Sequence, residues 1–355
     1  MYIDAALLRD RFRASFLAHA IGDAIGKRVE TMAPDAIRAA TGGRGVIGFG
    51  PVLHGSLPSV ARLRPEQWTD DTQLALATAR ALVRGNGFDL RRIAAEHVVE
   101  YMRERRGWGR STERGIAELA AQDRQPGQPV RDPAAHGMGN GVAMKVLPLA
   151  LMTAMPPGKV SAQTFDAHLR HIVGHSEQLQ QFAQLTHRDA CARIGAHILL
   201  LCLHEVLRMS ARRDALPQRG LGQASIMTGA VLPGSYTTCD AHGMLLSSVF
   251  RSIVSGGMVA TQAALIRTSC DVRESVPFVI ATAIQYMDRP PSEGILAAVN
   301  AGGDTDSNAA MVGSLLGARH GTHALPPEWV ERIEARDEII ALADGLFDLM
   351  LRTGV

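Results

Sequence analysis

The sequence predicts an all-α protein that folds as a single large orthogonal helical bundle. Apolar residues recur with the period of a helix along most of the 355 residues, whereas strict alternation of apolar and polar residues, which marks a half-buried strand, is hard to find. Clusters of Gly and Pro divide the helical segments, and no internal repeat stands out. Because single domains can exceed the usual size of ~100–200 residues, we expect one domain over residues 1–355.

The segments with the clearest helical period follow one another along the chain. They are residues 5–20, 71–84, 90–105, 142–152, 189–209, 276–287, 292–299, 307–319 and 327–350. The Gly- or Pro-rich stretches that divide them are residues 42–50, 125–141, 156–158, 216–222, 231–234 and 289–291. The segment 71–84 combines Leu74, Leu76 and Leu82 with an Ala-rich remainder. A helix that is apolar on most faces belongs in the middle of a large domain.

Composition and charge restrict the class of protein. The chain is 46% hydrophobic and 20% charged, which suits a soluble protein with a sizeable core. Its net charge of +2 indicates neither nucleic acid nor a membrane surface as a partner. The N-terminal residues lack the pattern of a signal peptide. No apolar stretch approaches the ~18–20 residues of a membrane span, and the longest candidate, residues 198–203, is expected to be a buried piece of helix.

Cysteine and histidine usage gives no indication of a thiolate or zinc site. The cysteines are Cys191, Cys202, Cys239 and Cys270. They form no C-x-x-C pair, so we expect reduced thiols in a cytoplasmic protein, and a monomer by default. His168, His171 and His175 recur at helical spacing, but no Cys or acidic cluster accompanies them. Packed or solvated histidines are therefore favoured over zinc ligands.

Two segments gather carboxylates and hydroxyls at the beginning of an Ala- and Leu-rich helix. Residues 68–73 read WTDDTQ, and residues 302–308 read GGDTDSN. Acidic and hydroxyl side chains at such a position can cap the helix, but one Asp is enough for capping. Adjacent carboxylates repel one another unless a cation lies between them, and carboxylate and hydroxyl oxygens suit Mg²⁺. Metal binding is favoured, and capping with surface charge remains the alternative.

Two other acidic motifs do not fit the second segment. An EF-hand loop that began at Asp304 would need Gly at its sixth position and Glu at its twelfth. These positions hold Ala309 and Leu315. A D-x-D phosphatase nucleophile normally follows a hydrophobic strand, whereas residues 301–303 are Ala-Gly-Gly. Both interpretations are therefore disfavoured.

The order of the motifs resembles the ADP-ribosylglycohydrolases, the family of the dinitrogenase-reductase-activating glycohydrolase and of the ADP-ribosylarginine and ADP-ribosylserine hydrolases. The matching segments extend over nearly the whole chain. They are residues 21–26, 29–30, 68–73, 139–148, 185–189, 299–307, 313–321 and 326–329. Each motif is weak alone, but their order is specific. The resemblance implies an all-α fold with a binuclear magnesium site, with Mn²⁺ as an alternative.

The resemblance also implies a set of metal ligands and catalytic residues. The implied ligands are Thr69, Asp70, Asp71, Asp304, Asp306 and Ser307. Glu30 matches the glutamate beside the metals, where it would act as general base or control access of water, and Asp71 or Asp304 is the other candidate base. The cations would orient the ribose hydroxyls and stabilise charge during cleavage of a glycosidic bond.

The same resemblance implies residues that bind ADP-ribose. Residues 139–144 match a loop that wraps the ligand through Gly139, Asn140, Gly141 and Met144, although a simple turn before a helix is the alternative. His187 belongs to another matching motif, and a binding role has even weight with a structural one. Phe278 is a candidate to stack on the adenine, and Tyr236 is a weaker one, although core packing is the more frequent fate of such a Phe.

Two departures limit what the resemblance implies. The family usually has Arg after the Met of its G-N-G motif, whereas this chain has Lys145, which keeps the charge without the fork geometry. Ala190 replaces the Pro of the T-H-x-D-P motif, which affects only the start of a helix. Residues 161–184 and 209–252 have no clear counterpart in the family. The resemblance therefore does not indicate which ADP-ribosylated target the protein acts on.

The sequence favours a metal-dependent hydrolase that releases ADP-ribose from a modified target, with arginine-linked protein ADP-ribose as the expected substrate. The main alternative is a catalytically silent ADP-ribose-binding, immunity or structural protein of the same fold. Retention of an oxygen side chain at every implied ligand position favours the enzyme. A metal-dependent hydrolase of nucleotides is a third hypothesis, separated from the first only by the family resemblance.

Overall fold

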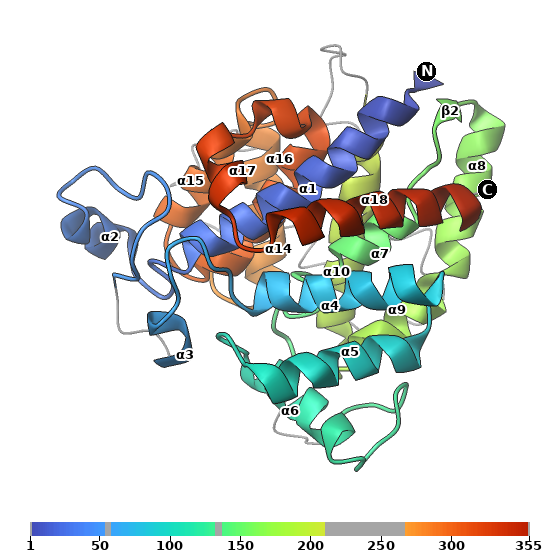
Figure 1. Ribbon diagram of the computed structural model, residues 1–355, viewed down its shortest axis with the longest axis horizontal. Helices are drawn as coiled ribbons and strands as arrows, with labels where there is room; N and C mark the ends of the chain where they lie inside the picture. Colours follow the sequence, from blue (N-terminus) through green and yellow to red (C-terminus); the bar gives the residue numbers. More distant parts are fainter. Residues whose placement is uncertain (1, 54–57, 132–136, 210–266, 354–355) are drawn as a thin grey trace.

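The computed structural model describes residues 2–53, 58–131, 137–209 and 267–353, and most of its regular structure is helical (Figure 1). The helices are α1 (Ala5–Gly26), α2 (Pro34–Ala40), α3 (Pro58–Ala61), α4 (Asp70–Gly85), α5 (Leu90–Arg103), α6 (Arg110–Ala120), α7 (Leu147–Met152), α8 (Ala162–Gly174), α9 (Ser176–Ala183), α10 (Ala190–Arg208), α14 (Val272–Gln285), α15 (Pro291–Asn300), α16 (Thr305–His320), α17 (Pro327–Arg332) and α18 (Arg336–Thr353). Two short antiparallel strands, β1 (Tyr2–Ile3) and β2 (Gly158–Lys159), pair Tyr2 with Lys159. The all-α prediction is therefore confirmed.

The centre of the fold is the contact between α1 and α16, whose backbones approach closely at glycines. A Cβ on Gly22 would lie 2.2 Å from the Ala309 carbonyl oxygen, and one on Gly313 would lie 2.2 Å from the Ala18 carbonyl oxygen. The Thr305 hydroxyl donates to the carbonyl of Gly26 at 2.8 Å. Because no side chain separates the two helices, the end of α1 lies directly against the acidic beginning of α16.

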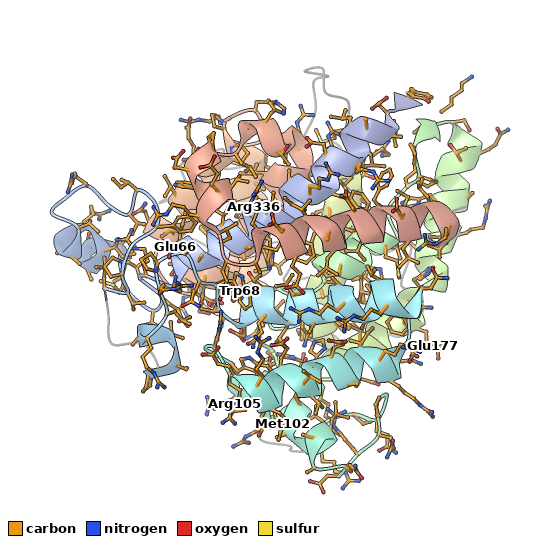
Figure 2. All side chains as sticks on the ribbon, viewed as in Figure 1. Glu66, Trp68, Met102, Arg105, Glu177 and Arg336 are labelled. Carbon is orange, nitrogen blue, oxygen red and sulfur yellow. The ribbon has the colours of Figure 1, made fainter. Side chains whose placement is uncertain are left out.

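Helix α18 packs against both α1 and α4, and α5 lies beside α4 on its other side (Figure 1). The segment before α4 is fastened to the segment before α18. The Trp68 indole N–H donates to the Glu334 carbonyl oxygen at 3.2 Å, and Arg106 stacks 4.5 Å from the Trp68 ring centroid while it pairs with Glu334 at 2.5 Å. Figure 2 shows Trp68 beside the beginning of α4. These contacts fix the loop from which the first acidic segment begins.

Helix α10 differs from the expectation that no apolar segment approaches the length of a membrane span. It is a 19-residue helix that is long and apolar enough to cross a bilayer by length and composition. Its most apolar window is 89% buried inside the protein, as in the core helix of a globular fold. Its apolar character is therefore accounted for by packing, and residues 198–203 form its buried middle as expected.

Some predicted boundaries were wrong. The segment 142–152 begins as a series of turns, with the Met144 N–H bonded to the Asn140 carbonyl at 3.0 Å, and only α7 is helical. The segment 327–350 is divided into α17 and α18, because Ile333 is extended and Ala335 has a φ of 58°. Helix α6 was missed, because none of the segments predicted as helical covers residues 110–120.

The prediction of one domain over residues 1–355 stays a prediction.

Candidate active site

A cavity of about 430 Å³ lies where the beginnings of α4, α6 and α16 meet the loop before α7. One side of it is acidic. The acidic lining residues are Glu30, Asp70, Asp71, Asp304 and Asp306. The rest is lined by glycines, hydroxyl groups and other side chains, among them Arg110, Arg114 and His187. The two acidic segments, more than 200 residues apart in sequence, are thus brought to one wall.

The acidic wall has the geometry of a cation site. Carboxylate oxygens of Glu30, Asp304 and Asp306 lie within 4.8 Å of one another, so these residues could hold a metal ion. Asp70 and Asp71 form the first turn of α4, and Asp304 precedes α16 as its N-cap without capping it through its side chain. Glu30, which the family resemblance places beside the implied metals, belongs to the same cluster as two implied ligands.

Asp23 organises this wall, although the sequence analysis gave it no role. It is fully buried in α1 and accepts from the backbone N–H groups of Thr69 and Thr72 at 2.9 and 3.0 Å. The hydroxyls of the same two threonines donate to it at 2.7 and 2.6 Å. Asp23 therefore caps α4 from another helix. Its position inside the matching segment 21–26 was the signal that could have identified it.

We predict that Asp23→Asn weakens Mg²⁺ binding about 10- to 100-fold, the usual effect of losing a group that orients metal ligands. An amide would present hydrogens to the donors of Thr69 and Thr72, and it lacks the negative charge. Calorimetric titration with Mg²⁺ measures the effect. Asp4→Asn is the matched control, because Asp4 caps α1 at an exposed position and Asn caps equally well. Unchanged affinity in Asp23→Asn would contradict the assigned role.

The carboxylates of the wall are held in an unfavourable state when no cation is present. Burial, followed by repulsion from neighbouring acids, raises the pKa values of Asp70, Asp71 and Asp306 well above normal. Burial raises the pKa of Glu30 to about 7, with further contributions from Asp304 and Asp23. Carboxylates this close bind protons when no cation is present, and they can ionise together only where a cation compensates their charge.

Two further observations show that these residues fit a divalent cation. The Asp71 Oδ1 atom is buried and has no hydrogen-bond partner among the described residues. The Thr69 hydroxyl gives its proton to Asp23 and lies 3.3 Å from Asp71 Oδ2 and 3.5 Å from Asp306 Oδ2. Its lone pairs therefore remain available beside the two carboxylates. An all-oxygen donor set of this kind suits Mg²⁺ or Mn²⁺.

The loop of residues 139–141 forms the wall next to the acids. The Asn140 side chain donates to Asp304 Oδ2 at 2.6 Å, and its backbone N–H donates to the Cys270 carbonyl at 2.8 Å. The His187 ring lies against Gly141, where an added Cβ would be 2.7 Å from the ring carbon Cε1. Side chains larger than hydrogen would therefore displace His187.

Another rim of the cavity, residues 107–109, lies beside Asp70 and is fastened to α4 through Gln73. Its side-chain oxygen accepts from the Trp108 indole N–H at 2.8 Å, and its amide donates to the Glu104 carbonyl at 2.7 Å. Gln73 also donates to Glu100 at 2.9 Å, and Glu100 pairs with Arg80 at 2.6 Å. The rim is thereby held at a fixed distance from the first turn of α4.

The structure brings together most of the residues that the sequence singled out. Those that line the cavity are Glu30, Asp70, Asp71, Gly139, Asn140, Gly141, Met144, His187, Asp304, Asp306 and Ser307. Thr69 lies just behind the wall, fully buried. Phe278 does not line the cavity. It is fully buried in α14 within the hydrophobic core, so its proposed contact with adenine is corrected to core packing. Tyr236 lies outside the described residues.

Comparison with known proteins identifies the family of the chain. Residues 4–354 match the family model described as ADP-ribosylglycohydrolase. The chain belongs to the ADP-ribosylglycohydrolase family. The family resemblance inferred from the motifs is therefore confirmed.

Relatives in this family are similar to the chain over most of their length. The chain is 27% identical to the ADP-ribosyl-[dinitrogen reductase] glycohydrolase of Rhodospirillum rubrum, covering 93% of this chain and 92% of that one. It is 25% identical to the human ADP-ribosylhydrolase ARH3, covering 96% and 94%. It is 27% identical to the ADP-ribosylarginine hydrolase Tri1 of Pseudomonas putida, covering 96% and 78%. A solved structure of an ADP-ribosylglycohydrolase-related protein complex superposes with a TM-score of 0.65 at 26% identity, covering 97% and 99%.

Proposed function

We propose that this ADP-ribosylglycohydrolase is a metal-dependent enzyme that cleaves the glycosidic bond between ADP-ribose and a modified target, with arginine-linked protein ADP-ribose as the favoured substrate. The observation that carries the proposal is the acidic wall, which gathers Glu30, Asp304 and Asp306 within 4.8 Å at a cavity of about 430 Å³. That volume lies in the range of small-molecule sites. The named relatives that hydrolyse ADP-ribose linkages support the same chemistry.

The cavity has the groups that the chemistry needs. Cleavage at C1 of the ribose passes through an oxocarbenium-like state. Two Mg²⁺ or Mn²⁺ ions, when bound, would orient the ribose hydroxyls and stabilise the developing charge. The implied ligands Thr69, Asp70, Asp71, Asp304, Asp306 and Ser307 would hold them. Glu30, whose carboxylate lies in the same cluster as Asp304 and Asp306, is placed to act as the general base.

The diphosphate of ADP-ribose would lie along the loop of residues 139–141. Glycines at positions 139 and 141 allow a ligand to approach the backbone closely, and backbone N–H groups bind phosphate oxygens. The beginning of α6, with Gly109 as its N-cap, lines the same cavity and adds a helix N-terminus. The acidic wall would then receive the ribose end of the ligand and the bond to the target.

Release of free ADP-ribose tests this proposal. Arginine-linked and serine-linked model substrates are incubated with the full chain in the presence of Mg²⁺ and, separately, of a chelator. We expect metal-dependent release from the arginine-linked substrate. Release from the serine-linked substrate alone would retain the enzyme class and overturn the favoured linkage. No release from either substrate, together with ADP-ribose binding, would instead support the catalytically silent binding protein.

A further inference from the structure

A buried chain of hydrogen bonds leads from Lys145 to the cavity. The Lys145 side chain is fully buried, and its Nζ donates to the Thr186 hydroxyl oxygen at 2.8 Å. The same oxygen lies 2.8 Å from Nδ1 of His187. Thr186 is also fully buried, and only 4% of His187 is exposed. Lys145, Thr186 and His187 therefore form a relay of three polar side chains, and the last of them lines the cavity.

We infer that Lys145 and Thr186 are positioning residues that fix His187 as the tautomer with its proton on Nε2, so that the ring presents a hydrogen-bond donor to an anionic oxygen of the ligand at the 139–141 loop. The inference deepens the proposed function and rests on it for the identity of the ligand. Neither Lys145 nor Thr186 needs to touch the ligand for this role.

The direction of each hydrogen bond between Lys145, Thr186 and His187 follows from which groups can donate a proton. An ammonium group can only donate, so the Thr186 oxygen accepts from Lys145. The hydroxyl has one proton, and among its hydrogen bonds within the described residues the other partner is Nδ1 of His187. If Nδ1 also carried a proton, the buried hydroxyl proton would have no acceptor there. Nδ1 therefore accepts, and the proton of the neutral ring is on Nε2.

The electrostatic surroundings keep the imidazole neutral. Burial, with a further contribution from the Lys145 charge, lowers the pKa of His187 to about 3. A neutral ring has a single N–H, so its position is decided by the hydrogen bond at Nδ1. Burial also lowers the pKa of Lys145 to about 7, against an opposing contribution from Asp70.

The ring orientation directs Nε2 to the ligand loop. A Cβ built on Gly139 would lie 3.5 Å from Nε2, and one on Gly141 would lie 3.1 Å from it. Nδ1 faces Thr186 on the other side of the ring. An N–H at Nε2 adds a hydrogen-bond donor to this part of the cavity, which suits an anionic oxygen such as those of a diphosphate.

The segment that carries the relay is held rigidly. The Arg124 guanidinium, which is fully buried, donates to the carbonyls of Leu185 and Gly115 at 2.5 and 2.6 Å. The Lys145 ammonium lies 5.5 Å from the centroid of the Phe182 ring. Thr186 is therefore fixed between a held backbone and a buried cation, as a group that sets a tautomer must be.

The tautomer itself is the first test, and it does not depend on the ligand. Long-range proton–nitrogen correlation spectra of the full chain at pH 6, below the pKa of Lys145, distinguish a protonated Nε2 from a protonated Nδ1. The His187→Gln variant assigns the His187 signals. We expect the proton on Nε2. A proton on Nδ1 would overturn the inference.

Affinity for ADP-ribose, measured by calorimetry with Mg²⁺ present, is the second test. Thr186→Val removes the hydroxyl without changing the shape, and we expect it to weaken binding about tenfold, the effect of one lost hydrogen bond of ordinary strength. Thr186→Ser keeps the hydroxyl and should bind within about twofold of the wild type. In a His187→Gln background, whose amide places a donor near the former Nε2, Thr186→Val should have no further effect.

The outcomes separate the relay from the proposed function. A tenfold loss that persists in the His187→Gln background would show that Thr186 does not act through His187, and equal binding by Thr186→Val and Thr186→Ser would also overturn the relay. If wild-type protein fails to bind ADP-ribose, the proposed function is contradicted, and the tautomer measured by spectroscopy still decides whether the relay exists.

Discussion

Asp304→Asn is expected to lower turnover roughly a hundredfold to a thousandfold while the helical fold stays intact, because a bound cation contributes several kcal/mol to the stabilisation of the transition state. Asp304 shares the acidic triad with Glu30 and Asp306 and accepts from the Asn140 side chain at 2.6 Å. An amide keeps the shape of the carboxylate and removes its charge, so the loss of rate should be accompanied by loss of bound metal.

Rates of ADP-ribose release and Mg²⁺ binding, measured on the same preparation, check this prediction. Asp337→Asn is the control, since its side chain is 91% exposed on α18 and lies outside the cavity lining. It should have the rate and the metal affinity of the wild type. Full activity in Asp304→Asn would remove the acidic wall from the mechanism. Loss of rate with full metal binding would assign Asp304 to proton transfer instead.

Mg²⁺ is expected to raise the melting temperature far more at pH 7.5 than at pH 5.5. At about 100 times its Kd, a ligand stabilises the fold by ~2.7 kcal/mol, which corresponds to roughly 4 °C for a chain of this size. The pKa of Glu30 is raised from 4.5 to about 7, and those of Asp70, Asp71 and Asp306 are raised well above normal. Protons therefore compete with the cation at the lower pH.

The sign follows from proton linkage. A carboxylate whose pKa is higher in the folded chain binds more protons there than in the unfolded chain, so the metal-free protein loses stability as pH rises from 4.5 to about 7. Mg²⁺ offsets this loss only where the acids are ionised. Buried histidines such as His19 and His97, whose pKa values burial lowers to about 4 and 3, contribute in the opposite direction. The difference between melting temperatures with and without Mg²⁺ largely cancels their contribution.

Differential scanning calorimetry at the two pH values provides the measurement, with Asp304→Asn as the variant that should lose the increment. The Asp337→Asn protein should keep it. An increment that is equal at pH 5.5 and pH 7.5 would show that the cation binds away from the acids with raised pKa values.

The sequence by itself determined the helical class, the family and the position of both acidic segments. These features are local, because a carboxylate at the first turn of a helix is placed by its own helix. The segments at Asp70 and Asp304 could therefore be predicted from neighbouring residues. The order of motifs added the family, and with it the expectation that the two segments share one site.

Only the tertiary structure decided which side chains support that site. Asp23 reaches Thr69 and Thr72 across 46 and 49 residues of sequence, and Lys145 reaches Thr186 across 41. The same composition and periodicity would allow Phe278 to face either a ligand or the core, and the packing of α14 turned it to the core. Hydrogen bonds and burial between distant segments depend on how the helices are placed in space, and helical periodicity holds no information about that placement.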